Sequence, residues 1–163
     1  EKVAAQFEGD AQRILIVDLD VHQGNGTAAL FQNNSSVFTF SVHCKANYPF
    51  QKELSDLDIP LEDNTKDIAY LSILEEALLN LLKNLQPDFV FYLSGVDVLN
   101  EDKLGRLSLT LEGAKKRDEI VISACYERNI PVQCSMGGGY APDVNVIVEA
   151  HANTYRVAED IHG

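Results

Sequence analysis

The chain contains 163 residues, of which 45% are hydrophobic and 23% charged, as expected of a globular domain with a hydrophobic core. Its formal net charge of -12 and isoelectric point near 4.6 exclude a bare nucleic-acid binder, because such proteins need a basic face to meet phosphates. The apolar runs are only a few residues long. Neither a nucleic acid nor a membrane is therefore expected as a partner.

The start of the chain and the cysteines indicate a cytoplasmic location. EKVAAQFEGDAQR is polar and predicts the tail of a helix or a linker, not a secretory signal. Cys44, Cys125 and Cys134 lie far apart and form no CxxC pair, a pattern typical of a reducing compartment. We expect Cys125 and Cys134 to be buried structural thiols.

Hydrophobic runs alternate with helical patterns along the chain. The β-branched, aromatic and aliphatic runs predict strands over residues 13–20, 36–43, 57–61, 88–97 and 130–140. Apolar residues at three- and four-residue steps predict helices over residues 67–85, over about 111–128, and from Pro142 or Asp143 onward. Pro60 indicates an edge position or a strand end for the short third strand.

Two residues are candidate helix caps. Asn64, followed by Asp67, resembles a cap for the first long helix, and Thr110 for the second. Strands that look buried on both faces and are separated by helices predict an α/β fold with three αβα layers and a mainly parallel sheet.

Three polar clusters follow predicted strands of this sheet. Asp18, Asp20 and His22 end the first strand, Asp97 follows DFVFYLSGV, and residues 137–140 (GGGY) follow VQCSM. Ligands of parallel sheets bind beyond the carboxyl ends of the strands, so the clusters are expected to converge. Side chains alternate along a strand, and Asp20, His22 and Asp97 would offer two oxygens and one nitrogen to a metal with a position left open.

Each cluster also has an alternative interpretation. The two aspartates of DLDVH could cap the next helix, GGGY could be a tight turn with a packed tyrosine, and Asp97 could be a helix cap. A hydrophobic strand ending in DxDx also resembles the haloacid dehalogenase family, where the first Asp is a phosphoryl-transfer nucleophile with magnesium. DLDVH lacks the Thr or Val usual at the fifth position of that motif, and no downstream Asp-Asp pair accompanies it.

Together and in this order, the clusters resemble the histone deacetylase family with its arginase/deacetylase-like fold. The matching pieces are DLDVHQGNGT, the FTFSVH strand, SGVDVLNEDKLGRLSLT and MGGGYAP, with features of the bacterial and class IV branch. The resemblance implies three zinc ligands, Asp20, His22 and Asp97. It also implies that Tyr140 hydrogen-bonds the substrate carbonyl. Further substrate-binding positions implied are Gly138, Gly139 and Tyr48.

The implied reaction is zinc-dependent hydrolysis of an acetyl-amide bond, with an acetylated lysine or another acetylated amine as substrate. Zinc polarises the carbonyl and activates water, a histidine takes the proton of this water, and Tyr140 stabilises the oxyanion. The resemblance further implies a potassium site near Asp18, which also orients a catalytic histidine, with Ser41 and Val42. Phe31 and Val37 match a second monovalent site, and Asn25 stands where many members carry an Asp.

The family requires an adjacent His-His pair, and none occurs here. The four histidines are His22, His43, His151 and His162. His43 is expected to be structural or to support the site, and His151 to lie at the surface or in packing. Because the family places the pair upstream of the DLDVH strand, residues 1–163 are expected to be the C-terminal portion of a single deacetylase catalytic domain.

Such a portion, taken alone, is expected to be inactive. It would associate as a homo-oligomer or with the missing half of the domain, because it exposes a surface which that half covers. The alternative from another class is a non-catalytic metal-binding or interaction protein derived from a deacetylase.

Overall fold

The computed structural model describes residues 13–163, and all of the predicted helix tail or linker except its last residue, Arg13, lies outside this range. Each predicted strand and long helix is present, with its ends moved by no more than a few residues. The strands are β1 (Ile14–Asp18), β2 (Val37–Cys44), β3 (Leu57–Leu61), β4 (Phe89–Gly95) and β5 (Val132–Gly137), and the helices are α1 (Asn25–Phe31), α2 (Asp67–Leu85), α3 (Leu111–Tyr126) and α4 (Val144–His162).

The five strands form one parallel sheet in the order β3-β2-β1-β4-β5. Pro60 lies on the edge strand β3, where a residue without an N–H is tolerated, so its predicted edge position is confirmed. The chain runs from β1 outward through β2 to β3, then crosses back to β4 on the other side of β1 and continues to β5. The strand order therefore reverses between β1 and β4, the place where open α/β sheets bind ligands.

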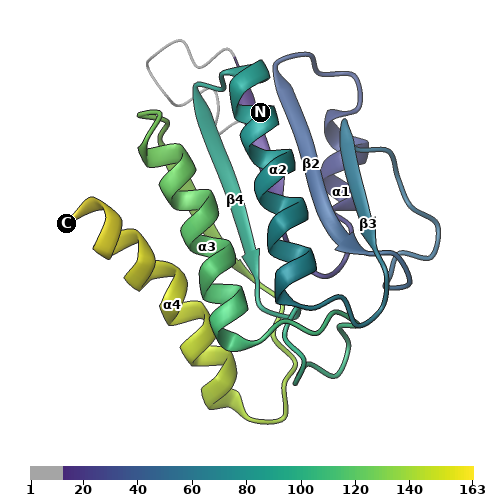
Figure 1. Cartoon of the computed structure of the whole chain (residues 1–163). Helices are drawn as coiled ribbons and strands as arrows, with labels where there is room; N and C mark the ends of the chain where they lie inside the picture. Colours follow the sequence, from purple (N-terminus) through teal and green to yellow (C-terminus); the bar gives the residue numbers. More distant parts are fainter. Residues whose placement is uncertain (1–12) are drawn as a thin grey trace.

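Helices cover both faces of the sheet, which confirms the three-layer αβα prediction. Helices α2, α3 and α4 lie on one face and α1 on the other (Figure 1). The alternation of β1 fits this arrangement: Leu15 and Val17 enter the large core beneath α2 and α3, whereas Ile14 and Ile16 join a smaller cluster with Phe31 of α1. The second face carries only this short helix within the described residues.

The caps of α2 and α3 show one wrong and one correct prediction. Lys66 occupies the N-cap of α2 and makes no side-chain cap, while Asn64 lies in the preceding turn with φ 62°. Asp67 instead accepts hydrogen bonds from the amide and hydroxyl of Thr110, at 2.9 and 2.7 Å, and joins two helix starts. Thr110 caps α3 as predicted, accepting from the Gly113 amide at 2.9 Å.

Two further features bear on the expectations from sequence. Cys125 is buried as predicted, whereas Cys134 is only partly buried and Cys44 is buried instead. Among residues 13–163, none of the helices combines the length and hydrophobicity needed to cross a membrane.

Candidate metal centre

The first half of the centre forms where β1 ends. β1 stops at Asp18, so the expected extended conformation does not persist to His22. Two successive side-chain turns replace it: Asp18 Oδ1 accepts the Asp20 amide at 3.1 Å, and Asp20 Oδ1 accepts the His22 amide at 2.9 Å. Asp20 and His22 are thus fixed on one side of the turn by backbone groups of their own segment.

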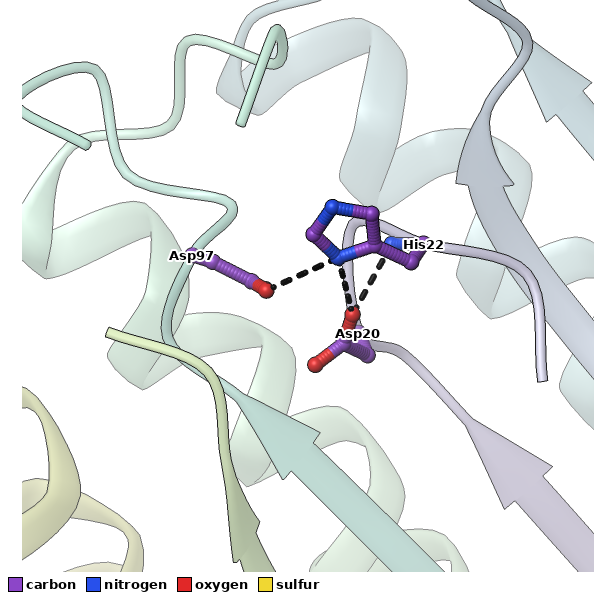
Figure 2. A group of neighbouring side chains, drawn as sticks. All are labelled: Asp20, His22 and Asp97. Atoms are coloured by element: carbon purple, nitrogen blue, oxygen red, sulfur yellow. Dashed lines mark hydrogen bonds and ion pairs between the residues drawn. The ribbon is translucent and has the colours of Figure 1, made fainter. Parts of the chain in front are cut away.

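Asp97 completes the centre from the loop after β4, the strand next to β1. His22 Nδ1 lies 3.0 Å from Asp20 Oδ1 and 3.2 Å from Asp97 Oδ2 (Figure 2). One ligand atom from each of the three residues can be chosen so that all lie within 4.8 Å of one another. The structure therefore brings together the three predicted metal ligands at the point where the strand order reverses.

Two glycines, Gly95 and Gly138, make this convergence possible. A Cβ on Gly95 would lie 2.6 Å from Asp20 Cα, and a Cβ on Gly138 would lie 2.4 Å from Asp97 Cγ. Gly138 also has φ +61°, a conformation that favours glycine. A Cβ on Gly137 would make only an ordinary contact, 3.4 Å from Asp20 Oδ2. Predicted residue Gly138 thus packs directly against a predicted ligand.

The three side chains form a strongly coupled electrostatic group. The carboxylate of Asp20, at hydrogen-bond distance, and the nearby carboxylate of Asp97 raise the pKa of His22 to about 10. Burial would raise the pKa of Asp20, but its hydrogen bonds with His22 outweigh burial and lower it. Burial raises the pKa of Asp97. The group therefore favours a cation between two carboxylates, which is here the protonated imidazole.

The donor set fits a divalent transition metal. Asp97 Oδ2 is buried and accepts no well-aligned hydrogen bond within the described residues. A buried carboxylate oxygen left in this state is costly unless a cation meets it. Two carboxylates and one imidazole match the N and O ligands of catalytic zinc, which keeps a position open for water or substrate.

Comparison with known proteins agrees with this geometry. The model of the histone deacetylase domain matches residues 2–155. The chain belongs to the histone deacetylase domain family. It is 48% identical over 157 residues to an uncharacterised protein of Picosynechococcus sp. (strain ATCC 27264 / PCC 7002 / PR-6), covering 96% of this chain and 52% of that protein. This assignment removes the haloacid dehalogenase alternative.

Relatives that are named as histone deacetylases also match this chain. Histone deacetylase 2 of Arabidopsis thaliana is 34% identical over 148 residues, which cover 88% of this chain and 38% of that protein. A crystal structure of an HDAC homologue complexed with SAHA superposes with a TM-score of 0.76 at 25% identity, covering 93% of this chain and 42% of that one. The chain thus spans about half the length, or less, of the curated relatives it matches.

In this histone deacetylase-family chain, Asp18 lies at the end of β1, two residues before the predicted ligand Asp20. Its carboxylate is buried, and a Cβ on Gly24 would lie 2.2 Å from its Oδ2. Burial raises the pKa of Asp18 to about 7. Ser41 pairs with Asp18 between β1 and β2, and its hydroxyl lies 2.9 Å from His43 Nδ1. Predicted residues Asp18, Ser41 and Val42 therefore share one end of the sheet, all of them buried.

Tyr140 and Tyr48 are less enclosed. Tyr140 is 51% exposed, and its amide donates to Asp102 Oδ2 at 2.6 Å. Gly139 before it has φ +106°, with Val96 and Ile147 against the position of a Cβ. Tyr48 is 63% exposed and its ring meets that of Phe50 edge-on. No hydrogen bond joins either tyrosine hydroxyl to the predicted metal ligands among the residues described.

Two residues at the centre were missed from sequence. Asn47, adjacent to Tyr48, is buried and lies 3.5 Å from His22 Nε2 through its Nδ2, which also donates to the Leu104 carbonyl at 2.7 Å. Asp102 holds the loop after Asp97 by accepting from Leu104, and it also accepts from Tyr140. Single polar residues within loops carry no periodic signal, so only spatial proximity reveals them.

The remaining histidines do not form an adjacent pair. His43 is buried at the end of β2, as a supporting residue was expected to be. His151 of α4 is partly buried and packs beneath the glycine turn, with Nε2 3.7 Å from the position of a Gly139 Cβ. Of the two settings expected for His151, the surface or packing, the structure shows packing, against the turn that carries Tyr140.

Proposed function

We propose that this chain supplies the metal-binding half of a zinc-dependent deacetylase catalytic domain that hydrolyses the amide of an acetylated lysine or another acetylated amine. The observation that carries the proposal is the convergence of Asp20, His22 and Asp97. Membership of the histone deacetylase domain family supports the acetyl-amide as the substrate class.

Asp20, His22 through Nδ1, and Asp97 would hold the zinc ion. Zinc would supply Lewis-acid polarisation of the acetyl carbonyl and a lowered pKa for water. Gly138 allows Asp97 to stay in place, because any side chain there would meet the carboxylate. Gly139 lets the chain turn towards Tyr140 with a positive φ.

Tyr140 would donate its hydroxyl hydrogen bond to the substrate carbonyl and to the oxyanion that develops from it. Its half-exposed position leaves the ring accessible to a substrate, and the Asp102–Tyr140 amide bond fixes the backbone. Tyr48 would form part of the wall that contacts the acylated side chain. Asp18 would orient a catalytic histidine and, with Ser41 and Val42, form a potassium site.

Proton transfer would depend on residues outside this chain. Its sequence contains no adjacent His-His pair. Within residues 13–163, β5 pairs with β4 on one side only, which leaves an edge for another strand. Met136 of β5 and Val148 of α4 are 63% and 60% exposed. We therefore propose association with the rest of the domain, or with a second copy, and negligible activity for residues 1–163 alone.

Metal binding tests the first part of the proposal. Zinc is titrated into the complete natural polypeptide that carries this sequence, into Asp97→Asn, and into Asp63→Asn, whose exposed carboxylate pairs with Arg106 at 3.2 Å. We expect the wild-type protein to bind one zinc per chain. The zinc affinity should fall by about 10–100-fold in Asp97→Asn and should not change in Asp63→Asn. Equal affinity in all three proteins would refute the site.

Activity tests the second part. The complete protein is assayed on an acetyl-lysine peptide and an acetylated polyamine, with and without chelator. We expect chelator-sensitive release of acetate from at least one substrate, and stabilisation of the zinc-loaded protein by SAHA, the molecule bound in the similar HDAC homologue. Zinc binding without any acetate release would favour the alternative, a non-catalytic metal-binding protein.

A further inference from the structure

Arg117 lies in an unusual place for a guanidinium. It belongs to α3, its side chain is fully buried, and it points to the carboxyl ends of β1 and β4. Long charged side chains are almost never fully buried unless they are paired. The hydrogen-bond partners of Arg117 therefore indicate its structural role.

Nη1 of Arg117 donates to two backbone carbonyls, one on each side of the metal centre. It lies 2.5 Å from the Gly95 carbonyl and 3.3 Å from the Leu19 carbonyl. Leu19 immediately precedes the proposed ligand Asp20, and Gly95 lies two residues before the proposed ligand Asp97. One guanidinium thus bridges the two chain segments that carry the ligands.

A buried acid holds the guanidinium in position. Asp118 Oδ1 accepts from Arg117 Nε at 2.9 Å and lies 2.8 Å from Nη2. The same carboxylate accepts from the hydroxyls of Tyr92 on β4 and, at 2.7 Å, Thr154 on α4. The pair is fully enclosed and hydrogen-bonded on both partners, so the direction of the guanidinium is set by three elements at once.

The backbone pairing between β1 and β4 ends close to the proposed metal ligands. Beyond Asp18 the regular ladder between β1 and β4 ends, and the Leu19 amide to the Leu93 carbonyl, at 3.1 Å, is the last bond that continues it. The Val21 amide then donates to Asp97 Oδ1 at 3.0 Å, a bond from one ligand segment to a ligand of the other. The hydrogen bonds of Arg117 to the Leu19 and Gly95 carbonyls lie between these two bonds and connect the two segments there.

We propose that Arg117 is a positioning residue of the metal centre: by bridging the Leu19 and Gly95 carbonyls it sets the separation of Asp20 and His22 from Asp97. The proposal rests on the proposed metal binding by these three residues. A planar guanidinium can reach both carbonyls and Asp118 together, whereas a lysine ammonium on its flexible stem cannot reproduce this geometry.

The test compares Arg117→Lys and Arg117→Gln with Arg128→Lys in the complete natural polypeptide. Arg128 is a matched control, because it lies just beyond the other end of α3 and donates to the Ala124 carbonyl at 2.9 Å. Zinc affinity is measured by competition titration, and the ligand geometry by the visible absorption spectrum of the Co²⁺-loaded protein at saturation. The melting temperature of the metal-free protein reports folding separately.

We expect a zinc affinity about 10-fold or more weaker in Arg117→Lys, a changed Co²⁺ spectrum, and wild-type behaviour in Arg128→Lys. If Arg117→Gln does not fold, Arg117→Lys decides, because it retains the charge beside Asp118. A lowered melting temperature with wild-type affinity and spectrum would assign Arg117 a merely structural role and overturn the proposal. Failure of the wild-type protein to bind either metal would overturn the proposed function itself, and this inference with it.

Discussion

Gly95→Ala is a steric test of the metal centre. The Cβ of alanine would lie 2.6 Å from Asp20 Cα and 2.7 Å from Asp20 Oδ2, whereas ordinary contacts begin at 3.4 Å. The obstacle is backbone, which cannot rotate away, so β4 and the segment after β1 must separate by about 0.8 Å at this point. Metal-site distances tolerate only about 0.2 Å, so the proposed ligands could no longer meet one ion in the same geometry.

The expected result is a zinc affinity lowered by at least about 10-fold, with a stability loss of about 1–3 kcal/mol for overpacking. Zinc titration and urea unfolding of the metal-free protein measure the two effects. Gly26→Ala is the control, since nothing lies within 4 Å of a Cβ there and the site is helical. It should be neutral or stabilising by up to about 1 kcal/mol. Unchanged zinc affinity in Gly95→Ala would refute the argument that this contact sets the ligand geometry.

Three further predictions concern single side chains: His22, Thr110 and Cys125. Because the pKa of His22 is raised to about 10, its stabilisation of the metal-free protein is complete below pH 6.5 and is lost as the pH rises towards 10. Zinc must displace this proton, so calorimetry at pH 8 in buffers of different ionisation enthalpy should show about one proton released, and none would contradict the coupling. Thr110→Ala should cost about 1–2 kcal/mol in urea unfolding through the lost cap of α3, and Thr110→Ser should restore it; equal midpoints for Thr110→Ala and wild type would exclude the cap. Burial raises the pKa of the Cys125 thiol to about 12, so native protein at pH 8 should react with iodoacetamide far more slowly at this residue than unfolded protein, and equal rates would show that the thiol is not protected.

Local pattern predicted the regular elements well where it was strong. The helix over 67–85 shows repeated leucines at helical steps, and its bounds match α2. The seven residues of α1 are too few to show this period, and no helix was predicted there. The cap at Asn64 was wrong because Asp67 reaches across to Thr110 instead, a contact between residues 43 positions apart that no local pattern contains.

The residues of the candidate centre were likewise predictable only where the sequence pattern was strong. Asp20, His22 and Asp97 were found because polar residues at the ends of hydrophobic strands are conspicuous in sequence, and parallel strands place such ends together. The alternation that suggested Asp20 and His22 was right in outcome but not in cause, since side-chain turns rather than an extended strand orient them. Asn47 and Arg117 could not be found in this way, because one is a loop residue and the other lies in a helix whose face only packing defines.

The sequence by itself determined the five strands, the three long helices, the polar residues at the strand ends and the resemblance to the histone deacetylase family. These features depend on periodic burial and on turns within a few residues, which are local properties of the chain. Only the tertiary structure decided that β1 lies against β4, that Gly95 and Gly138 make room for Asp20 and Asp97, and that Arg117 bridges their segments. Strand order and close approach depend on how distant surfaces pack, and therefore on contacts that no short stretch of sequence encodes.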